Sequence, residues 1–429
     1  MTKTRVLALL ASAALILTVF VVLPGVGADE KTNSSKDALY RPLGLFTEVL
    51  SLVRSNYVEP VELKPLLSGA FAGLTDAMDP FAEYIPPDRV ANFNALRAAE
   101  EKGDVLDIGI VLARRFSYPV VVAATSGSPA AASGVKSDDI IEEIDGQPAR
   151  SMAIWEVESK LAGKAGGRVR LTVVREGKPR RRTIDIVRSS WVPSAPFAVR
   201  AEGETIITIS AFVPGTAAEL KKILAPLDRT RPLLLDVRNN GIGSYDEAAR
   251  CAALFVPAGP LGELRGRRIA AKSFRAEPGE RVHEGHLVVL VDSGTAGPAE
   301  FFAAAVREAS GARQTAIASK EAEEDSSETG EEEEVPPTPS ATPVRLVGEP
   351  TGGMGFMQRV IPLASGGSLK LSVGKFYGPA GRALSPKGLN PDDRVYQLPP
   401  EETPGRPETD PFLKRGLKVL AELHGPLAA

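Results

Sequence analysis

The chain is poor in the residue types that form disulfides and metal sites. Its 429 residues include a single cysteine, Cys251, and three histidines, His283, His286 and His424. One cysteine cannot form an internal disulfide, so stability must come from hydrophobic cores, and Cys251 is predicted to be a buried, inert thiol. Since His283 and His286 lack acidic partners at ligand spacing, we expect neither a metal ion nor any other cofactor.

The chain also lacks a strong excess of charge, because its formal net charge is −3 and 24% of its residues are charged. No basic stripe dominates, so nucleic acid is not expected as a partner. The basic run from Lys178 to Arg182 is interpreted as the solvated edge of a strand. The length predicts roughly two or three domains.

Residues 1–28 are predicted to be a secretory signal. Lys3 and Arg5 precede a long uncharged apolar stretch, and Val26 and Ala28 are small residues at the spacing of a cleavage site. The stretch is long enough that an uncleaved membrane anchor is the alternative. In either case the rest of the chain is expected outside the cytoplasm, in the periplasm or cell envelope, touching a membrane only through this segment.

Helical spacing is present near both ends of the remaining chain. In residues 39–103, apolar residues recur three and four positions apart, which predicts a helical N-terminal domain. In the tail, residues 396–429, Asp410 is a good helix cap and Pro411 a good first helical residue. The apolar docking face of this last helix is predicted to consist of Leu413, Leu417 and Leu420.

Residues 104–189 change to short β-branched runs separated by Gly, Ser, Pro and Lys, with two helical pieces between them. This order, and the stretch "SGSPAAASGVKSDDIIEEIDGQPA", resemble a PDZ domain. The resemblance implies that backbone N–H groups near Ile108, Gly109 and Ile110 hold the C-terminal carboxylate of a peptide that extends an open sheet edge. Another small β domain without a ligand is the alternative.

Residues 190–395 alternate strands with helices, which predicts an α/β domain with a largely parallel sheet in a multidomain α+β protein. Two glycine-rich turns, Arg238 to Ser244 and Asp292 to Gly297, follow predicted strands. In such sheets, binding and catalysis occur at the carboxyl ends of the strands. We therefore expect the two turns to form one site.

Residues 319–343 interrupt this α/β domain with nine acidic residues and one lysine. The segment has no aromatic residue and no aliphatic run, so it cannot bury enough surface to fold. It is predicted to be a disordered insert. It serves either as a solvated spacer or as a shield or lure for basic partners.

The order of signal, helical domain, PDZ domain and α/β core resembles that of the carboxyl-terminal processing peptidases, also called tail-specific proteases. Active members are serine proteases with a Ser–Lys dyad, in which the PDZ domain captures a C-terminus that the core cleaves. The resemblance covers nearly all of the chain after the signal. It is carried by several ordered blocks: "YVEP", "AMDPFAEYI", "ISAFVPGTAAELKKIL", "LLLDVRNNGIGSYDEAARCAALFVP", "LVVLVDSGTAGPAEFFAAAVREASGAR", "VGEPTGGMGFMQ" and "LKLSVGKFYGPAGRALSPKGLNPD".

The resemblance also implies that the catalytic dyad is missing. The family's nucleophile block, Gly-Ser-Ala-Ser-Ala-Ser-Glu, aligns with "GTAGPAE" and places the attacking serine at Gly297. The base block, Gly-Glu-x-Thr-x-Gly-Lys-Gly-x-x-Gln, aligns with "GEPTGGMGFMQ"; it places the lysine at Met354 and retains Gln358. Glycine has no side chain to acylate, and a thioether is not basic enough to take a hydroxyl proton.

An oxyanion donor is expected to be missing as well. The family uses the N–H of the residue after the nucleophile, and here that residue is Pro298, which has none. Loss of one such donor costs ~10²- to 10³-fold in rate. Gly243, in the turn after the Arg-Asn-Asn strand, could still supply the second donor. Pro298 is also simply a good first residue for a helix.

Other residues are poor substitutes for the missing groups. Ser293 and Thr295 flank the turn, but they are displaced from the nucleophile position by more than a reactive geometry tolerates. Lys375 belongs to a later strand, at a position that is not catalytic in the family. The sequence therefore predicts an inactive relative that binds C-terminal tails or unstructured peptides.

Such a protein would be a scaffold or regulator: it would shield tails, tether partners, or regulate an active relative by forming mixed oligomers. Its expected protein partners are therefore an active relative or further copies of itself in a homo-oligomer. Two alternatives remain open at this point. One is an active serine endopeptidase with a relocated nucleophile at Ser293 or Thr295, and the other is a structural envelope protein without a ligand.

Overall fold

The computed structural model describes residues 30–150, 152–175, 178–309, 344–396 and 410–423. The predicted signal, the predicted acidic insert and His424 lie outside these residues. The chain divides into two compact units, residues 1–70 and 71–429. The first unit holds helix α2 and the beginning of helix α3. None of the described helices is long and apolar enough to cross a membrane.

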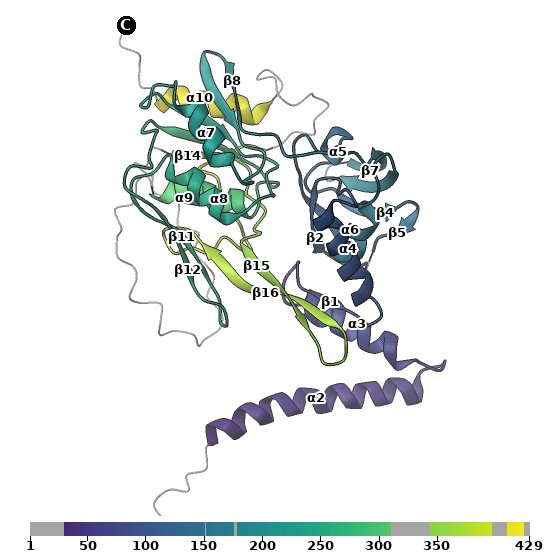
Figure 1. The fold of residues 1–429 in the computed structure, drawn as a ribbon. Coiled ribbons are helices and arrows are strands. Elements are labelled where there is room, and N and C mark those ends of the chain that lie inside the picture. Colours follow the sequence, from purple (N-terminus) through teal and green to yellow (C-terminus); the bar gives the residue numbers. More distant parts are fainter. Residues whose placement is uncertain (1–29, 151, 176–177, 310–343, 397–409, 424–429) are drawn as a thin grey trace, which may run out of the picture. The chain divides into compact units, whose positions relative to one another are not determined.

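The helices are distributed along the whole described chain (Figure 1). They are α2 (Glu30–Asn56), α3 (Leu63–Asp76), α4 (Val90–Lys102), α5 (Pro129–Ala132), α6 (Ile154–Leu161), α7 (Thr216–Leu224), α8 (Tyr245–Ala253), α9 (Pro298–Ala309) and α10 (Pro411–Leu423).

The strands belong to the second unit. They are β1 (Glu83–Ile85), β2 (Ile110–Arg115), β3 (Tyr118–Ala124), β4 (Ile140–Ile144), β5 (Gln147–Pro148), β6 (Arg168–Arg175), β7 (Lys178–Val187), β8 (Phe197–Ala201), β9 (Glu204–Thr208), β10 (Leu233–Asp236), β11 (Gly259–Arg265), β12 (Lys272–Ala276), β13 (Leu287–Val291), β14 (Val344–Gly348), β15 (Phe356–Pro362), β16 (Ser368–Tyr377) and β17 (Asp393–Arg394).

A six-stranded sheet in the order β17-β14-β13-β10-β9-β8 forms the centre of the α/β core. The first five strands are parallel and β8 joins the edge antiparallel, so the prediction of a largely parallel sheet is confirmed. Alternate side chains of β10 lie on opposite faces: Leu233 and Leu235 pack in the larger core with α7, α8 and α9, whereas Leu234 packs in a second core with α10. Both faces of the sheet are therefore covered (Figure 1).

Helix α10 begins as the sequence predicts. The N–H groups of Phe412 and Leu413 donate to Asp410 Oδ1 at 3.0 and 3.1 Å, which satisfies amides at the helix start. Leu413, Leu417 and Leu420 are buried in the second core, so the predicted docking face is confirmed. Arg238, after β10, donates to the same carboxylate at 3.0 Å and links this helix to the sheet.

The PDZ region is a five-stranded antiparallel path in the order β2-β3-β4-β6-β7, with β5 paired to β4. Strand β2 is an edge strand. The bridge between Leu106 and Gly163 joins the start of β2 to the end of α6, and Arg114 donates to the Met152 carbonyl at 2.8 Å near the other end. Helix α6 therefore runs antiparallel to β2 along its open side.

A second antiparallel sheet, in the order β1-β16-β11-β12 with β15 paired to β16, completes the second unit. Strand β1 lies within residues 39–103, the segment expected to be helical. It adds to this sheet because Glu83, Tyr84 and Ile85 pair with residues of β16.

Candidate functional site

The carboxyl ends of β10 and β13 bring the two glycine-rich turns together. The two strands pair in parallel, so the turns that follow them leave the same edge of the sheet. Ala296 donates its N–H to the Asn240 carbonyl at 2.9 Å, and Asn239 donates its N–H to Asp292 Oδ1 at the same distance. The sequence placed both turns at this edge, and the backbone bonds show that they form one structure.

The positions predicted for the nucleophile and the base, Gly297 and Met354, are neighbours. Gly297 has a φ of 55°, and a Cβ built on it would lie 3.8 Å from the Met354 carbonyl oxygen. It would lie 3.5 Å from the hydroxyl of Tyr245. A serine side chain therefore has room here, although a left-handed backbone conformation costs a non-glycine residue roughly 1–2 kcal/mol.

Glu300 ties these two positions together. Its carboxylate is fully buried and accepts four hydrogen bonds. Oε2 accepts from the N–H groups of Gly297 and Met354, both at 2.8 Å. Oε1 accepts from the N–H of Gly353 at 2.6 Å and from the hydroxyl of Thr351 at 2.5 Å. One carboxylate thus braces both loops, and the N–H of Gly297 is already hydrogen-bonded to it.

Two buried carboxyl groups at the site have unusual acidity. Burial raises the pKa of Glu300 to about 7, and its four hydrogen bonds oppose the rise. Burial also raises the pKa of Asp292 to about 6, against the hydrogen bond from Asn239. A carboxyl that titrates near neutral pH often marks an acid or base. Here both groups accept hydrogen bonds from their own loop and from the neighbouring loop, so both are suited to bracing the turns.

Met354 occupies an apolar environment. Its side chain packs with Val111 and Phe356 against a buried hydrophobic cluster. That cluster consists of Phe81, Ala113, Val122 and Ala296. A lysine at this position would place an ammonium group among these side chains, whereas a thioether packs there without desolvating a charge.

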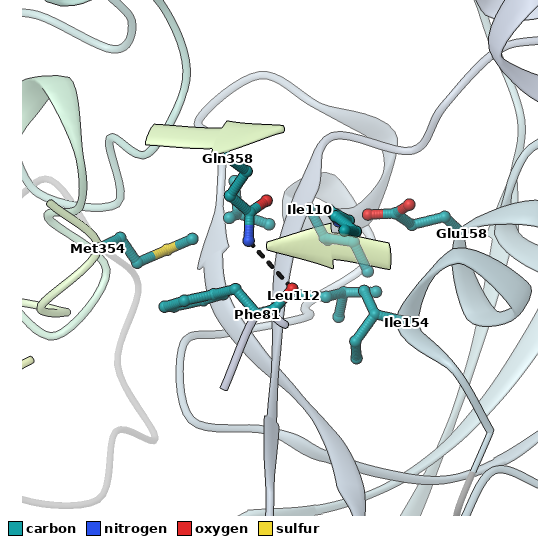
Figure 2. Close-up of a pocket in the computed structure, with 9 residues that line it drawn as sticks. Phe81, Ile110, Leu112, Ile154, Glu158, Met354 and Gln358 are labelled. Atoms are coloured by element: carbon teal, nitrogen blue, oxygen red, sulfur yellow. Dashed lines mark hydrogen bonds between the residues drawn. The ribbon is translucent and has the colours of Figure 1, made fainter. Parts of the chain in front are cut away.

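Gln358, the third residue of β15, lines the same pocket as Met354 (Figure 2). Its Nε2 donates to the carbonyl of Phe81 at 3.0 Å. The pocket has a volume of about 240 Å³ and lies between the PDZ region and the β15–β16 hairpin. Gln358 therefore connects the site to the segment that precedes the PDZ region.

The structure uses Thr295 as a buried structural hydroxyl. Thr295 is fully buried; its Oγ1 lies 3.1 Å from the Val237 carbonyl and 3.0 Å from Asp292 Oδ1, and it accepts the N–H of Asp292 at 3.0 Å. Ser293 is half-buried at the far end of the turn from Gly297. Lys375 is exposed, with Nζ 5.8 Å from the ring centroid of Phe356.

Gly243 and Pro298 are the two positions that bear on the oxyanion donors. Gly243 has a φ of 128°, and a Cβ there would lie 2.2 Å from the carbonyl oxygen of Phe212, so only glycine fits. Pro298 is the first residue of α9, as its helix-forming character predicts, and it offers no N–H. The role of Gly243 as a donor stays a prediction.

Tyr245 is a site residue that sequence reasoning missed. Its hydroxyl donates to the Met354 carbonyl at 3.2 Å, and its ring stacks on that of Phe376 with centroids 3.3 Å apart. Burial and the nearby Glu300 raise its pKa well above the usual value, so the phenol stays protonated and cannot act as a base near neutral pH. Its place directly after the glycine turn at Ser244 was the available signal.

Glu300 was also missed, although it is the last residue of the block quoted for the nucleophile. Among the described residues, His283, His286 and Cys251 form no hydrogen bond or ion pair with Gly297, Met354 or Glu300. Burial lowers the pKa of His283 to about 4 and raises that of Cys251, which is fully buried as predicted. Among the described residues, no group of three or more His, Cys, Asp or Glu side chains could hold a metal ion.

The predicted carboxylate-binding loop of the PDZ region differs from expectation in one respect. Gly109 donates its N–H to Asp107 Oδ1 at 2.6 Å, and Trp191 Nε1 donates to the same oxygen at 3.2 Å. A peptide carboxylate must therefore displace Asp107 to use this amide. Ile108 is buried, and Ile110 begins β2 and lines the pocket.

Comparison with known proteins agrees with the PDZ region and the α/β core. The model of "Peptidase family S41" matches residues 205–316 and 341–395, and that of "PDZ domain" matches residues 120–175. The chain is 25% identical over 388 residues to a carboxy-terminal-processing protease of Bartonella bacilliformis, covering 89% of this chain and 81% of the relative. It is 25% identical over 396 residues to the carboxy-terminal processing protease CtpA of Bacillus subtilis, covering 91% and 76%.

Among solved structures, the photosystem II D1 C-terminal processing protease matches with a TM-score of 0.62 and 22% identity, over 89% of this chain and 92% of that one. Fold and matches together define a multidomain protein with a PDZ domain and an S41 peptidase-like core. The chain belongs to the carboxy-terminal processing protease family.

Proposed function

We propose that this protein is an inactive member of its family, which binds the C-terminal tails of envelope proteins through its PDZ domain as a scaffold or regulator. The observation that carries the proposal is which residues stand at the site that Glu300 braces. Glu300 holds the loops of Gly297 and Met354 in contact, yet one position has no side chain and the other a thioether. Neither group can form an acyl intermediate or accept a hydroxyl proton.

The surroundings of the two positions support the same proposal. The phenol of Tyr245, which would face a side chain at Gly297, stays protonated because its pKa is raised. The hydroxyl of Thr295 is committed to buried partners, so it could act as a nucleophile only after the turn rearranged. Pro298 removes one amide, and Glu300 occupies another.

Binding is supported by the PDZ domain, whose strand β2 is an edge strand beside α6. An edge strand can accept a peptide as an additional strand through main-chain hydrogen bonds. A scaffold of this kind could shield tails or place them beside an active relative, in a mixed or homo-oligomer.

The test is proteolysis of an unstructured protein with an apolar C-terminus by three forms of the chain. They are the wild type, the variant Gly297→Ser/Pro298→Ala/Met354→Lys, and a matched control with Gly297→Ala in place of Gly297→Ser. We expect cleavage only by the serine-containing variant. Cleavage by the wild type would overturn the proposal, and cleavage by the alanine control would show that any activity arises elsewhere.

If none of the three forms cleaves the substrate, binding of C-terminal tails by the wild type becomes the deciding measurement. Tail binding without cleavage supports a binding protein whose groove has also lost the alignment needed for cleavage. Absence of both cleavage and tail binding would overturn the binding function and favour a purely structural protein.

A further inference from the structure

The open edge of β2 is short. The N–H of Arg114 donates to the Pro80 carbonyl at 3.0 Å, so the far end of the strand is already paired. Only the part from Ile110 to Ala113 is available for an added strand. At ~3.3 Å per residue, this edge suits the last few residues of a chain.

Glu158 lies on the wall opposite this edge. Since Leu106 bridges Gly163 and Arg114 binds the Met152 carbonyl, β2 and α6 run antiparallel, and Glu158 comes opposite Ile110. Figure 2 shows its carboxylate directed toward Ile110 across the pocket. A peptide added to β2 would therefore pass beside this group.

The carboxylate of Glu158 is half-buried and has no partner of its own. In the described part of the chain, no residue forms a hydrogen bond or ion pair with its side chain. Its other pocket neighbours on β2 and α6 are apolar: Ile110, Leu112 and Ile154. Burial raises its pKa, against the field of Lys370 and Arg97, which is the expected response of a carboxylate without a counter-ion.

Two cations, Lys370 on β16 and Arg114 on β2, are engaged with a different carboxylate. Lys370 Nζ lies 3.6 Å from Glu83 Oε2, and Arg114 lies 3.8 Å from Glu83 Oε1. Glu100 on α4 adds a further negative charge that acts on Glu158. The wall of the groove therefore combines apolar side chains with Gln358 and Lys370, and Lys370 is paired with Glu83. The carboxylate of Glu158 has no ion-pair partner among the described residues.

We propose that Glu158 selects C-terminal tails with a lysine or arginine among the residues just before an apolar last residue. This inference rests on the proposed tail-binding function and names its ligand class. The incoming cation would pair with Glu158 at a half-buried site, where such a pair is worth more than on an open surface. The apolar stem of the lysine or arginine would pack on Ile154 and Leu112.

The experiment measures binding of fluorescent peptides with a free carboxylate to the full protein. One series places lysine, norleucine or glutamate at each of the three positions before an apolar last residue. Norleucine keeps the four-carbon stem of lysine and removes its ammonium group. We expect the best lysine peptide to bind about tenfold more tightly than its norleucine match, equivalent to about 1.4 kcal/mol.

Three variants make the result specific. In Glu158→Gln the lysine preference should disappear while norleucine peptides bind as before, and in Glu158→Lys the preference should pass to glutamate peptides. Glu101→Gln, on the exposed face of α4, is the matched control and should keep the wild-type preference.

Equal binding of lysine and norleucine peptides by the wild type would overturn the role of Glu158 and leave tail binding intact. A lysine preference that persists in Glu158→Gln would overturn it as well. If no peptide with a free carboxylate binds the wild type, the proposed tail-binding function fails, and this inference fails with it.

Discussion

The PDZ groove lies along the edge strand of one sheet, and the braced core site lies at the carboxyl ends of the strands of another. The two sites differ in whether their polar groups have partners. The groove keeps an open strand edge and a carboxylate, Glu158, that forms no hydrogen bond or ion pair with the described residues. At the core site, Glu300 satisfies four donors and Met354 packs in an apolar cluster. One region offers an open strand edge, and the other is satisfied by its own residues.

The difference indicates how the two loops keep their fold whichever side chains stand at Gly297 and Met354. The brace at Glu300 joins backbone amides, which do not depend on which side chains stand at Gly297 and Met354. Side chains that carry out chemistry can therefore be replaced without loss of the loops. The comparison predicts large stability effects at the core site and small affinity effects at the groove.

The largest effect is expected for Glu300→Ala. The change leaves three buried N–H groups and the Thr351 hydroxyl without their acceptor, and we expect a loss of about 4 kcal/mol in the free energy of unfolding. Urea denaturation measures it, with Glu308→Ala as the control on the same helix, since that residue accepts one N–H from Ala380. Equal losses in the two variants would mean that Glu300 is no special brace.

The next effect is the pH dependence that Glu300 imposes. Its pKa rises from an ordinary 4.5 to about 7 in the folded chain, so its stabilising contribution is complete below pH 4.5 and is lost as the pH rises through 7. The loss is on the order of 3 kcal/mol. Glu300→Gln cannot titrate, so the stability of the wild type minus that of the variant should fall across this range. A difference that does not change with pH would contradict the raised pKa.

A smaller effect is expected for Thr295→Val, which removes a buried hydroxyl from Asp292 and Val237. We expect a loss of about 2 kcal/mol, and Thr295→Ser should recover most of it because the hydroxyl returns. Thermal or urea unfolding gives the values. Labelling of the wild type by an active-site phosphonate, abolished in Thr295→Val and kept in Thr295→Ser, would instead identify Thr295 as a relocated nucleophile.

The smallest effect is expected at the carboxylate-binding loop. Asp107→Ala frees the amide of Gly109 and removes a negative charge beside an incoming carboxylate, so free-carboxylate peptides should bind about 3- to 10-fold more tightly. Asp107→Asn keeps the oxygen acceptor and separates the two causes. Peptide titrations, with amidated peptides as controls, measure the change in affinity. Weaker binding by Asp107→Ala would show that Asp107 organises the loop for its ligand.

Much of the fold followed from periodicity alone. Alternating burial in β10 and the spacing of Leu413, Leu417 and Leu420 reflect repeats that are visible in the sequence. Strand β1 was missed, because three residues that pair with a distant strand leave no periodic signal. The adjacency of the two glycine turns followed from their positions after parallel strands.

The chemistry of the site was predictable only where the type of a single residue determines it. Tyr245 and Glu300 act through contacts with the loop that contains Gly353 and Met354, more than fifty residues away. No local sequence pattern indicates such contacts. The engagement of Gly109 by Asp107 likewise includes Trp191, from beyond the end of the PDZ region.

The sequence by itself determined which functional groups are present. Gly297 has no hydroxyl, Pro298 has no N–H and Met354 has no amine, whatever the fold. The tertiary structure decided what surrounds those positions. It placed Glu300 among the amides of two loops, and it placed Glu158 beside an open strand with no ion pair to any described residue. The reason is that composition belongs to single residues, whereas burial and pairing depend on distances between segments that only folding brings together.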